Sequence, residues 1–248
     1  MIVEIISLDR LLIVFAPAIL IILLMFRWQL PYRKACYAIA RMLIQLLLIG
    51  YALVMIFDSE SSWMTLAVLS VMVLASSWIS LNTLSGDVDT NMNKVSLYLI
   101  ALFSILVGGG SILVLVTQFV LVLDPWYYPR YMIPLAGMIF ATAMTSISLA
   151  AERFQSEVSQ GKSYEQARAV AFKTAMIPII NSMFAVGLVS LPGMMTGQIL
   201  SGVSPFIAAR YQIMVMGMLF SASGIASAMF LILLRGRFWG QSCSSASQ

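Results

Sequence analysis

The sequence predicts an all-α, polytopic membrane protein, and three observations support this. Hydrophobic residues make up 61% of the 248 residues, against about 45–50% in an ordinary soluble domain. Charged residues make up only 10%, against about 25%. The apolar residues also gather in runs of the length, about 20 residues, that a helix needs to cross a bilayer. So few charges cannot cover such a core in water, which excludes soluble enzymes, nucleic-acid-binding proteins and disordered chains.

Seven apolar runs follow one another, separated by short polar connections. We interpret each as a membrane-spanning helix, because lipid accepts only helices or closed barrels and these runs are too long for barrel strands. The predicted spans are 8–26, 39–57, 63–81, 97–123, 132–151, 177–200 and 211–234. They fill the chain, so we expect one transmembrane domain over residues 1–248, with a short flexible tail at 240–248.

The basic residues predict the orientation of this bundle. If the N-terminus lies outside, all Lys and Arg residues face the cytoplasm except Arg10, Arg130 and Arg210. Cytoplasmic loops of membrane proteins carry an excess of Lys and Arg, so we expect an N-out, C-in topology. The formal net charge of +4 then reflects the excess of basic residues in the cytoplasmic loops, and we expect no nucleic-acid partner.

The segment from Glu152 to Ala175 has the pattern of a helix, a corner and a second helix. Gly161 can end the first helix, and Ser163 followed by Gln166 forms a capping box that starts the second. One face of the second helix carries Tyr164, Ala167, Ala171 and Ala175, and another carries Glu165 and Arg168. From this pattern alone the segment, about 152–176, is either an interfacial helix on lipid or a docking site for a cytoplasmic partner.

The residue types exclude several kinds of chemistry. The chain has no histidine, so Ser-His-Asp hydrolysis, HExxH zinc hydrolysis and histidine-ligated haem are ruled out. Gly161-Lys162-Ser163 resembles the end of a phosphate loop, but Ser156 stands where the first glycine is needed and no strand precedes it. We therefore expect no enzyme activity, no ATP site and no cofactor on this chain. All Asp and Glu residues lie at span ends or in loops, which disfavours proton-coupled transport.

Glycines and polar residues inside the spans give candidate functional positions. Gly108, Gly109 and Gly110 indicate a kink or close helix packing in the fourth span. Arg41 and Gln45 share a helix face and either line a substrate path or bond a neighbouring helix. The further candidates for a path are Asn181, Met194, Met195, Thr196 and Gln198.

The sixth predicted span contains proline and glycine residues that are unusual in a membrane-spanning helix. Pro192 removes a backbone hydrogen bond, and Gly193 with Gly197 forms a small-xxx-small surface, so we expect a kinked and closely packed helix. Such helices border substrate cavities in transporters or serve packing alone. Met194 and Met195 are either ligands of a soft ion such as Cu(I) or fillers of gaps. No set of metal ligands is identified.

Three stretches resemble the FetB-type permeases, a family of membrane subunits of iron-export ABC transporters with plant relatives linked to aluminium tolerance. They are Arg41-Met-Leu-Ile-Gln-Leu-Leu-Leu-Ile-Gly-Tyr51, Ile133-Pro-Leu-Ala-Gly-Met138, and Gly187-Leu-Val-Ser-Leu-Pro-Gly-Met-Met-Thr-Gly197 continuing to Tyr211-Gln-Ile213. The resemblance runs through nearly the whole chain. One departure is Ala141-Thr142, where the family tends to carry Gly-Asn.

The resemblance implies a multi-pass permease of the cell inner (plasma) membrane that exports iron or a related metal species and serves metal ion homeostasis. It implies a homodimer of permeases and a separate ABC ATPase that holds ATP and Mg. It also places ATPase coupling at Gly161, Ser163, Glu165, Gln166 and Arg168. A non-ABC scaffold or assembly protein and a secondary carrier of a small solute are the alternatives. A bare Fe(II) ion prefers oxygen and nitrogen ligands, so a chelated metal or a small organic solute also fits the amide and hydroxyl groups of the spans.

Overall fold

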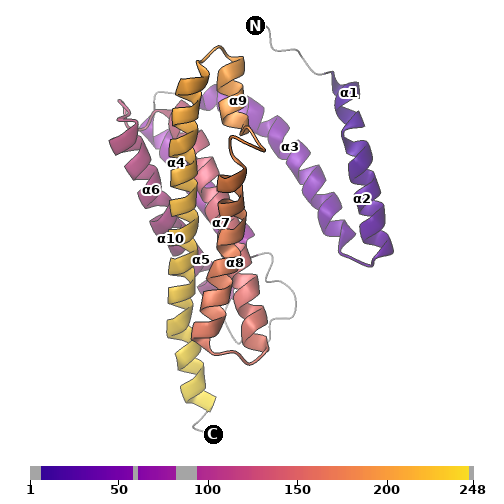
Figure 1. The fold of residues 1–248 in the computed structure, drawn as a ribbon, viewed down its shortest axis with the longest axis vertical. Helices are drawn as coiled ribbons and strands as arrows, with labels where there is room; N and C mark the ends of the chain where they lie inside the picture. Colours follow the sequence, from indigo (N-terminus) through magenta and orange to yellow (C-terminus); the bar gives the residue numbers. More distant parts are fainter. Residues whose placement is uncertain (1–6, 58–60, 82–93, 246–248) are drawn as a thin grey trace. The chain divides into compact units, whose positions relative to one another are not determined.

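The computed structural model describes residues 7–57, 61–81 and 94–245, and nearly all of these residues are helical (Figure 1). Within these ranges the structure has no strand beyond one isolated β-bridge between Val186 and Ser190. The all-α fold class is therefore confirmed. The chain forms two compact units, Met1–Ser59 and Glu60–Gln248, which are described separately.

The first unit is a helical hairpin. It contains α1 (Leu8–Ile13), α2 (Phe15–Arg27) and α3 (Tyr32–Phe57). The predicted span 8–26 is interrupted at Val14, because Pro17 lacks an N–H and its ring clashes with the carbonyl four residues earlier, at Ile13. Helix α3 begins seven residues earlier than the predicted span 39–57 and ends with it.

The second unit is a bundle of longer helices. It contains α4 (Ser62–Ser80), α5 (Lys94–Ile105), η2 (Leu106–Gly110), α6 (Ser111–Val114), η3 (Leu115–Val120), α7 (Pro129–Ser159), α8 (Tyr164–Ala185), α9 (Gly193–Leu200) and α10 (Pro205–Ser245). The segments α5 to η3 form one continuous helix with two π-helical stretches. Residues 240–245 of the predicted tail belong to α10, and residues 246–248 lie outside the described part of the chain.

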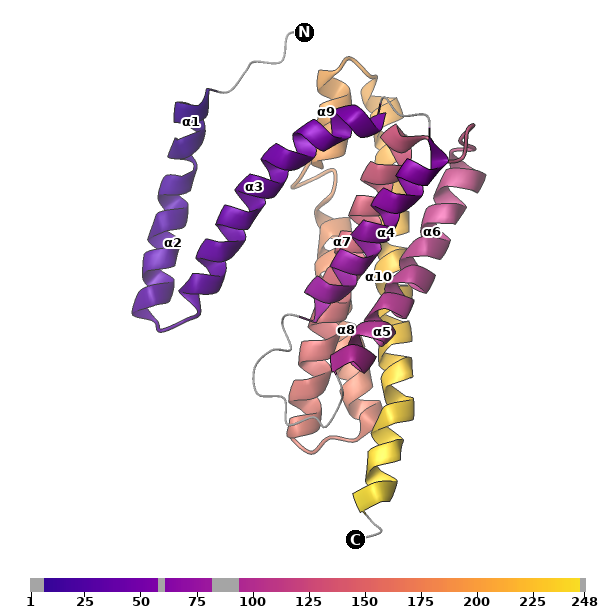
Figure 2. The ribbon, with the colours of Figure 1, turned by 180° about the vertical axis from the view of Figure 1, so that it is seen from behind.

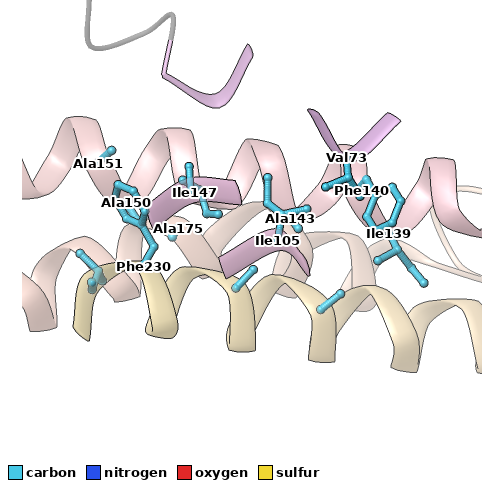
Figure 3. Packing of buried hydrophobic residues seen from close by; sticks show 14 of the residues in the cluster. Val73, Ile105, Ile139, Phe140, Ala143, Ile147, Ala150, Ala151, Ala175 and Phe230 are labelled. Atoms are coloured by element: carbon cyan, nitrogen blue, oxygen red, sulfur yellow. The ribbon is translucent and has the colours of Figure 1, made fainter. Parts of the chain in front are cut away.

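Helix α7 lies at the centre of this unit and packs against α4, α8 and α10 (Figure 2). Small residues bring the helices together, and Figure 3 shows Ala143, Ala150 and Ala175 between larger side chains such as Ile147 and Phe230. Close packing of this kind stabilises helices in lipid, where helix association has no hydrophobic driving force.

The glycines of the fourth predicted span lie at a close helix crossing, as one of the two interpretations predicted. A Cβ atom on Gly108 would lie 2.6 Å from the backbone nitrogen of Ala226 in α10. On Gly109 it would lie 3.0 Å from Ile139 in α7, whereas Gly110 has only Leu106 at 4.0 Å. The first two glycines therefore allow η2 to approach its neighbours.

Five helices are long and apolar enough to cross a membrane in the described ranges. They are Tyr32–Phe57, Ser62–Ser80, Lys94–Val120, Pro129–Ser159 and Pro205–Arg235. The other two predicted spans are both interrupted, 8–26 at Val14 and 177–200 between α8 and α9. The protein is a multi-pass helical membrane protein, and the count of seven crossings and the N-out orientation stay predictions.

Candidate coupling site at the corner of α7 and α8

The corner between α7 and α8 has the local geometry that the sequence predicts. Gly161 adopts a φ of +79°, a conformation that suits glycine because it has no Cβ, and its N–H donates to the Val158 carbonyl at 2.9 Å. The Ser163 hydroxyl accepts from the Gln166 N–H at 3.4 Å, and the Gln166 side chain accepts from the Ser163 N–H at 3.3 Å. Both halves of the capping box are present, so the predicted helix end and helix start are confirmed.

Glu157, in the last turn of α7, ties the corner together from inside. Its side chain is fully buried and forms ion pairs with Arg153, one turn earlier, and with Lys162 in the corner itself. Both basic side chains are partly exposed, so they bridge the buried carboxylate to solvent. A buried charge requires such partners, and this one fixes the path of the chain between the two helices.

Tyr164, the first residue of α8, joins the corner to α10. It is 9% exposed, and its hydroxyl donates to the Leu231 carbonyl at 2.7 Å. Its ring contacts the Phe154 ring edge to face, with 5.7 Å between centroids. The guanidinium groups of Arg168 and Arg235 lie 5.5 and 5.8 Å from its centroid, within cation–π range. One side chain thus contacts all three helices of this part of the bundle.

The alanine face of α8 is packed inside the bundle. Ala167, Ala171 and Ala175 are at most 1% exposed and belong to the core that α8 shares with α7 and α10. The interpretation of this segment as a helix lying on lipid is therefore wrong for that face. The exposed residues at the corner include Gly161, Lys162, Ser163, Glu165 and Gln166, which form a polar surface.

The corner lies at the end of a helix that is longer than the bilayer is thick. Helix α7 has 31 residues and is about 46 Å long at about 1.5 Å per residue, whereas the hydrocarbon core measures about 30 Å. The excess is enough to carry Glu157 and the corner beyond the lipid. The predicted coupling residues are thus gathered on one exposed polar corner, with Arg168 half-buried behind them.

The predicted kink in the sixth span is a complete break. Helix α8 ends at Ala185, and Gly187 turns the chain with a φ of +85° while its N–H donates to the Ser190 carbonyl at 3.0 Å. Pro192 is the N-cap of α9 and provides no side-chain cap. Proline disfavours helical geometry in the residue before it, so the two helices cannot join through Leu191.

The glycines after the break do not pack as predicted. A Cβ atom on Gly193 or Gly197 would meet no atom within 4 Å in the described part of the chain. The expected close contact through a small-xxx-small surface is therefore wrong within this unit. The turn before these glycines is apolar and open, with Leu188 91% and Val189 84% exposed.

The predicted path residues fall into three places. Met194, Met195, Thr196 and Gln198 are half-buried together on α9. Asn181 is exposed on α8, before the break. Arg41 (half-buried) and Gln45 (exposed) lie on α3 of the first unit.

Two contacts on α9 distinguish its residues. Met194 packs against the core, and the Thr196 hydroxyl donates to the Pro192 carbonyl at 3.1 Å. The Gln198 side-chain oxygen is buried without a hydrogen-bond partner among the described residues. The same residues contain no group of three or more Cys, Asp or Glu side chains that could hold a metal ion.

Sequence reasoning missed the burial of Glu157 and the anchoring role of Tyr164. The spacing of Arg153 and Glu157, four residues apart in a helix, predicts an ion pair, but nothing local predicts that the carboxylate is buried. Leu231 and Arg235 lie more than sixty residues from Tyr164, so only the fold reveals those contacts.

Comparison with known proteins agrees with this architecture. Residues 8–167 and 159–239 match the uncharacterised protein family UPF0014. No solved structure matches the chain.

Similar proteins occur in bacteria and plants. The UPF0014 membrane protein slr1647 of Synechocystis is 34% identical over 73% of each chain. The probable iron export permease protein FetB of Escherichia coli is 31% identical over 82% of this chain and 80% of its own. Protein ALUMINUM SENSITIVE 3 of Arabidopsis thaliana is 32% identical over 77% and 72%. The chain therefore belongs to the UPF0014 family of membrane proteins.

Proposed function

We propose that this protein is the permease subunit of an ABC transporter that exports iron or a related metal species across the inner membrane. A separate ATPase subunit binds ATP and Mg and hydrolyses the nucleotide, and two permeases pair in the complex. The observation that carries this proposal is the polar corner between α7 and α8, which is exposed on its outer side and anchored in the bundle on its inner side. Similarity to a probable iron export permease supports the cargo.

The corner has the two properties that a coupling element needs. Its exposed residues, including Ser163, Glu165 and Gln166, offer hydrogen-bond donors and acceptors to a partner protein. Its buried residues, Glu157 and Tyr164, connect that surface to α7 and α10 through ion pairs and a hydrogen bond. A push on the corner is therefore transmitted to two long helices and is not absorbed by a loose loop.

The break between α8 and α9 supports a role in transport. Backbone that is not helical is tolerated at membrane depth only where protein covers it or water reaches it. Transporters use such breaks to border their substrate path. In our proposal α9 carries the path residues Met194, Met195, Thr196 and Gln198 beside this break, and alternating access changes which side of the membrane they meet.

A secondary carrier and a scaffold protein are the rival functions. A proton-coupled carrier needs a carboxylate that gains and loses a proton within the membrane. The buried Glu157 lies near the end of α7 and is held by two cations, which suits a structural role. No observation on this chain specifically favours a scaffold.

Co-purification tests the proposal. The full chain carries a C-terminal tag and is extracted from its native membranes in mild detergent, and mass spectrometry identifies what is present in stoichiometric amount. We expect an ABC ATPase in near-equal amount, with ATP hydrolysis that rises on addition of iron. Its reproducible absence, under conditions that preserve other ABC complexes, would contradict the proposal.

A further inference from the structure

Two arginines from different helices meet at one tyrosine ring, at the end of the second unit that carries the corner. The ring of Tyr164 is held in place by its hydroxyl bond to the Leu231 carbonyl and by its contact with the Phe154 ring. The guanidinium carbons of Arg168, from α8, and Arg235, from α10, lie 5.5 and 5.8 Å from its centroid. Both positive charges are therefore held close to one fixed point between the two helices.

Neither of these arginines has an acidic partner among the described residues. Glu157 is already paired with Arg153 and Lys162, and Glu165, in the exposed corner, forms no ion pair with Arg168 or Arg235. Each guanidinium carries N–H donors that can serve an anion. Arg168 is half-buried, so its charge is partly removed from water and is stabilised by a partner of opposite sign. The two arginines thus form a cationic site that the described part of the chain leaves without a counter-charge.

This cationic site lies where apolar helix surface gives way to the polar corner. Arg235 is the last residue of the part of α10 that is long and apolar enough to cross a membrane. On the same face of α10, three residues earlier, Ile232 is exposed, and on α8 the exposed Phe172 follows Arg168 by four residues. Exposed apolar side chains in a membrane bundle face lipid. The two cations therefore lie at the level of the lipid headgroups, with apolar surface on the membrane side of them.

We propose that Arg168 and Arg235 bind the phosphate of an anionic lipid headgroup, in the leaflet that borders the corner. Guanidinium groups bind phosphate oxygens through charge-assisted hydrogen bonds, often two in parallel, which are stronger than bonds between neutral groups. The acyl chains of the same lipid lie against Phe172 and Ile232. The lipid joins α8 to α10 on the membrane side, beside the place where the buried Tyr164 joins them within the bundle.

The charge of the site selects a headgroup that is negative overall. A zwitterionic headgroup carries a cationic group close to its phosphate, and two guanidinium groups repel it. The headgroup of phosphatidylglycerol carries the phosphate charge alone. In the predicted orientation this end of the bundle faces the cytoplasm, and the cytoplasmic leaflet attracts basic residues near the membrane through its anionic lipids. The inference goes beyond the proposed transport function, because lipid binding needs neither an ATPase nor iron.

Lipid titration of the full chain tests this proposal. The purified protein is delipidated in mild detergent and titrated with phosphatidylglycerol or phosphatidylcholine, and native mass spectrometry counts the lipids bound per chain. We expect one phosphatidylglycerol per chain, bound roughly tenfold more tightly than phosphatidylcholine. Arg168→Gln and Arg235→Gln each weaken its binding about fivefold, the factor for one basic residue at an anionic membrane surface. Arg235→Lys, which keeps the charge but not the planar fork, loses less than Arg235→Gln.

Arg33→Gln is the matched control. Arg33 is exposed near the start of α3, its guanidinium carbon lies 6.0 Å from the Tyr32 ring centroid, and it is also predicted to face the cytoplasm. We expect this variant to bind phosphatidylglycerol as the unaltered protein does. Equal binding of the two lipids, or an equal loss in Arg33→Gln, would overturn the proposal. Displacement of the lipid by millimolar inorganic phosphate would also overturn it, because the site would then serve a free anion.

Discussion

Between α7 and α9 the chain leaves helical geometry at two glycines of positive φ, and the two places are built in opposite ways. At Gly161 the turn is short, a side-chain capping box starts the next helix, and a buried ion-pair cluster holds it. At Gly187 the turn is longer and apolar, its side chains are exposed, and α9 begins without a side-chain cap. Two residues with similar positive φ values therefore serve different ends.

The contrast shows how a membrane bundle can combine a firmly anchored corner at Gly161 with a loosely packed turn at Gly187. The Tyr164 hydrogen bond and the ion pairs of Glu157 tie the corner to α7 and α10, so in our proposal it moves as one piece with them. A Cβ atom on Gly187 would meet no described atom within 4 Å, and Leu188 and Val189 are exposed, so in our proposal this segment rearranges. The proposed transport cycle needs both, since force enters at the corner and the path must change shape.

The largest expected effect on stability comes from the close crossing of η2 and α10. Gly108→Ala drives a Cβ atom into the backbone of Ala226 in α10, where no side chain can turn away. We expect a loss of stability of about 1–3 kcal/mol, measured by thermal unfolding in detergent. Gly110→Ala is the matched control and stays near neutral, because its nearest atom lies 4.0 Å away. Equal effects of the two variants would show that the crossing is not close.

Valine substitutions at the two turns compare them directly. Gly161→Val and Gly187→Val each place a β-branched residue at positive φ, at a cost of roughly 1–2 kcal/mol. We expect Gly161→Val to abolish iron-stimulated ATP hydrolysis in the complex, without unfolding the bundle. Gly187→Val reduces transport but leaves most of the ATP hydrolysis. If both variants lose ATP hydrolysis to the same degree, the proposed difference between the turns at Gly161 and Gly187 is wrong.

Removal of one hydroxyl tests the role of Tyr164 as the link between the corner and α10. Tyr164→Phe keeps the ring and its contacts with Phe154 but leaves the Leu231 carbonyl without this donor. We expect a loss of about 1 kcal/mol in stability and a weaker response of ATP hydrolysis to iron. Tyr98→Phe is the control, because its hydroxyl makes only a long, exposed bond of 3.4 Å to Leu74. An unchanged iron response in Tyr164→Phe would show that the hydrogen bond from the corner to α10 does not contribute to coupling.

The smallest single effects are expected at the two cations around Glu157. Arg153→Gln and Lys162→Gln each leave the buried carboxylate with one remaining partner. Each lowers the unfolding midpoint by less than Tyr164→Phe does. The double variant leaves the charge without a cation, so it lowers the midpoint by more than the sum of the two. Additive effects would indicate that the carboxylate is not buried in the folded protein.

The corner was predictable because its determinants are local. Gly161, Ser163 and Gln166 lie within six residues, and the last two satisfy each other in the capping box, so the sequence alone indicates how one helix ends and the next begins. The break was only half predictable. Pro192 signals an interruption, but the positive φ of Gly187 converts a bend into a turn, and glycine alone does not announce that conformation.

A pocket lined by Asp124, Tyr128 and Tyr211, at the end of α7 opposite the corner, was not predictable from sequence. Asp124 and Tyr128 lie more than eighty residues from Tyr211, and each tyrosine taken alone suits a membrane-interface anchor. Packing of α7 against α10 is what brings these residues to one cavity. The burial of Glu157 could not be predicted for the same reason, because it depends on neighbouring helices and not on the spacing of residues along α7.

Cross-linking at the corner tests whether this surface contacts an ABC ATPase. Cys36 and Cys243 are replaced by serine, and Glu165→Cys, which spares the capping box, receives a thiol-attached photo-cross-linker. Ser201→Cys, exposed in the connection between α9 and α10, serves as the control. We predict a cross-link to an ABC ATPase from position 165 that changes when ATP is added, and none from position 201. No cross-link at 165 in a complex that contains the ATPase, or equal products from both positions, would contradict the proposed coupling role of the corner.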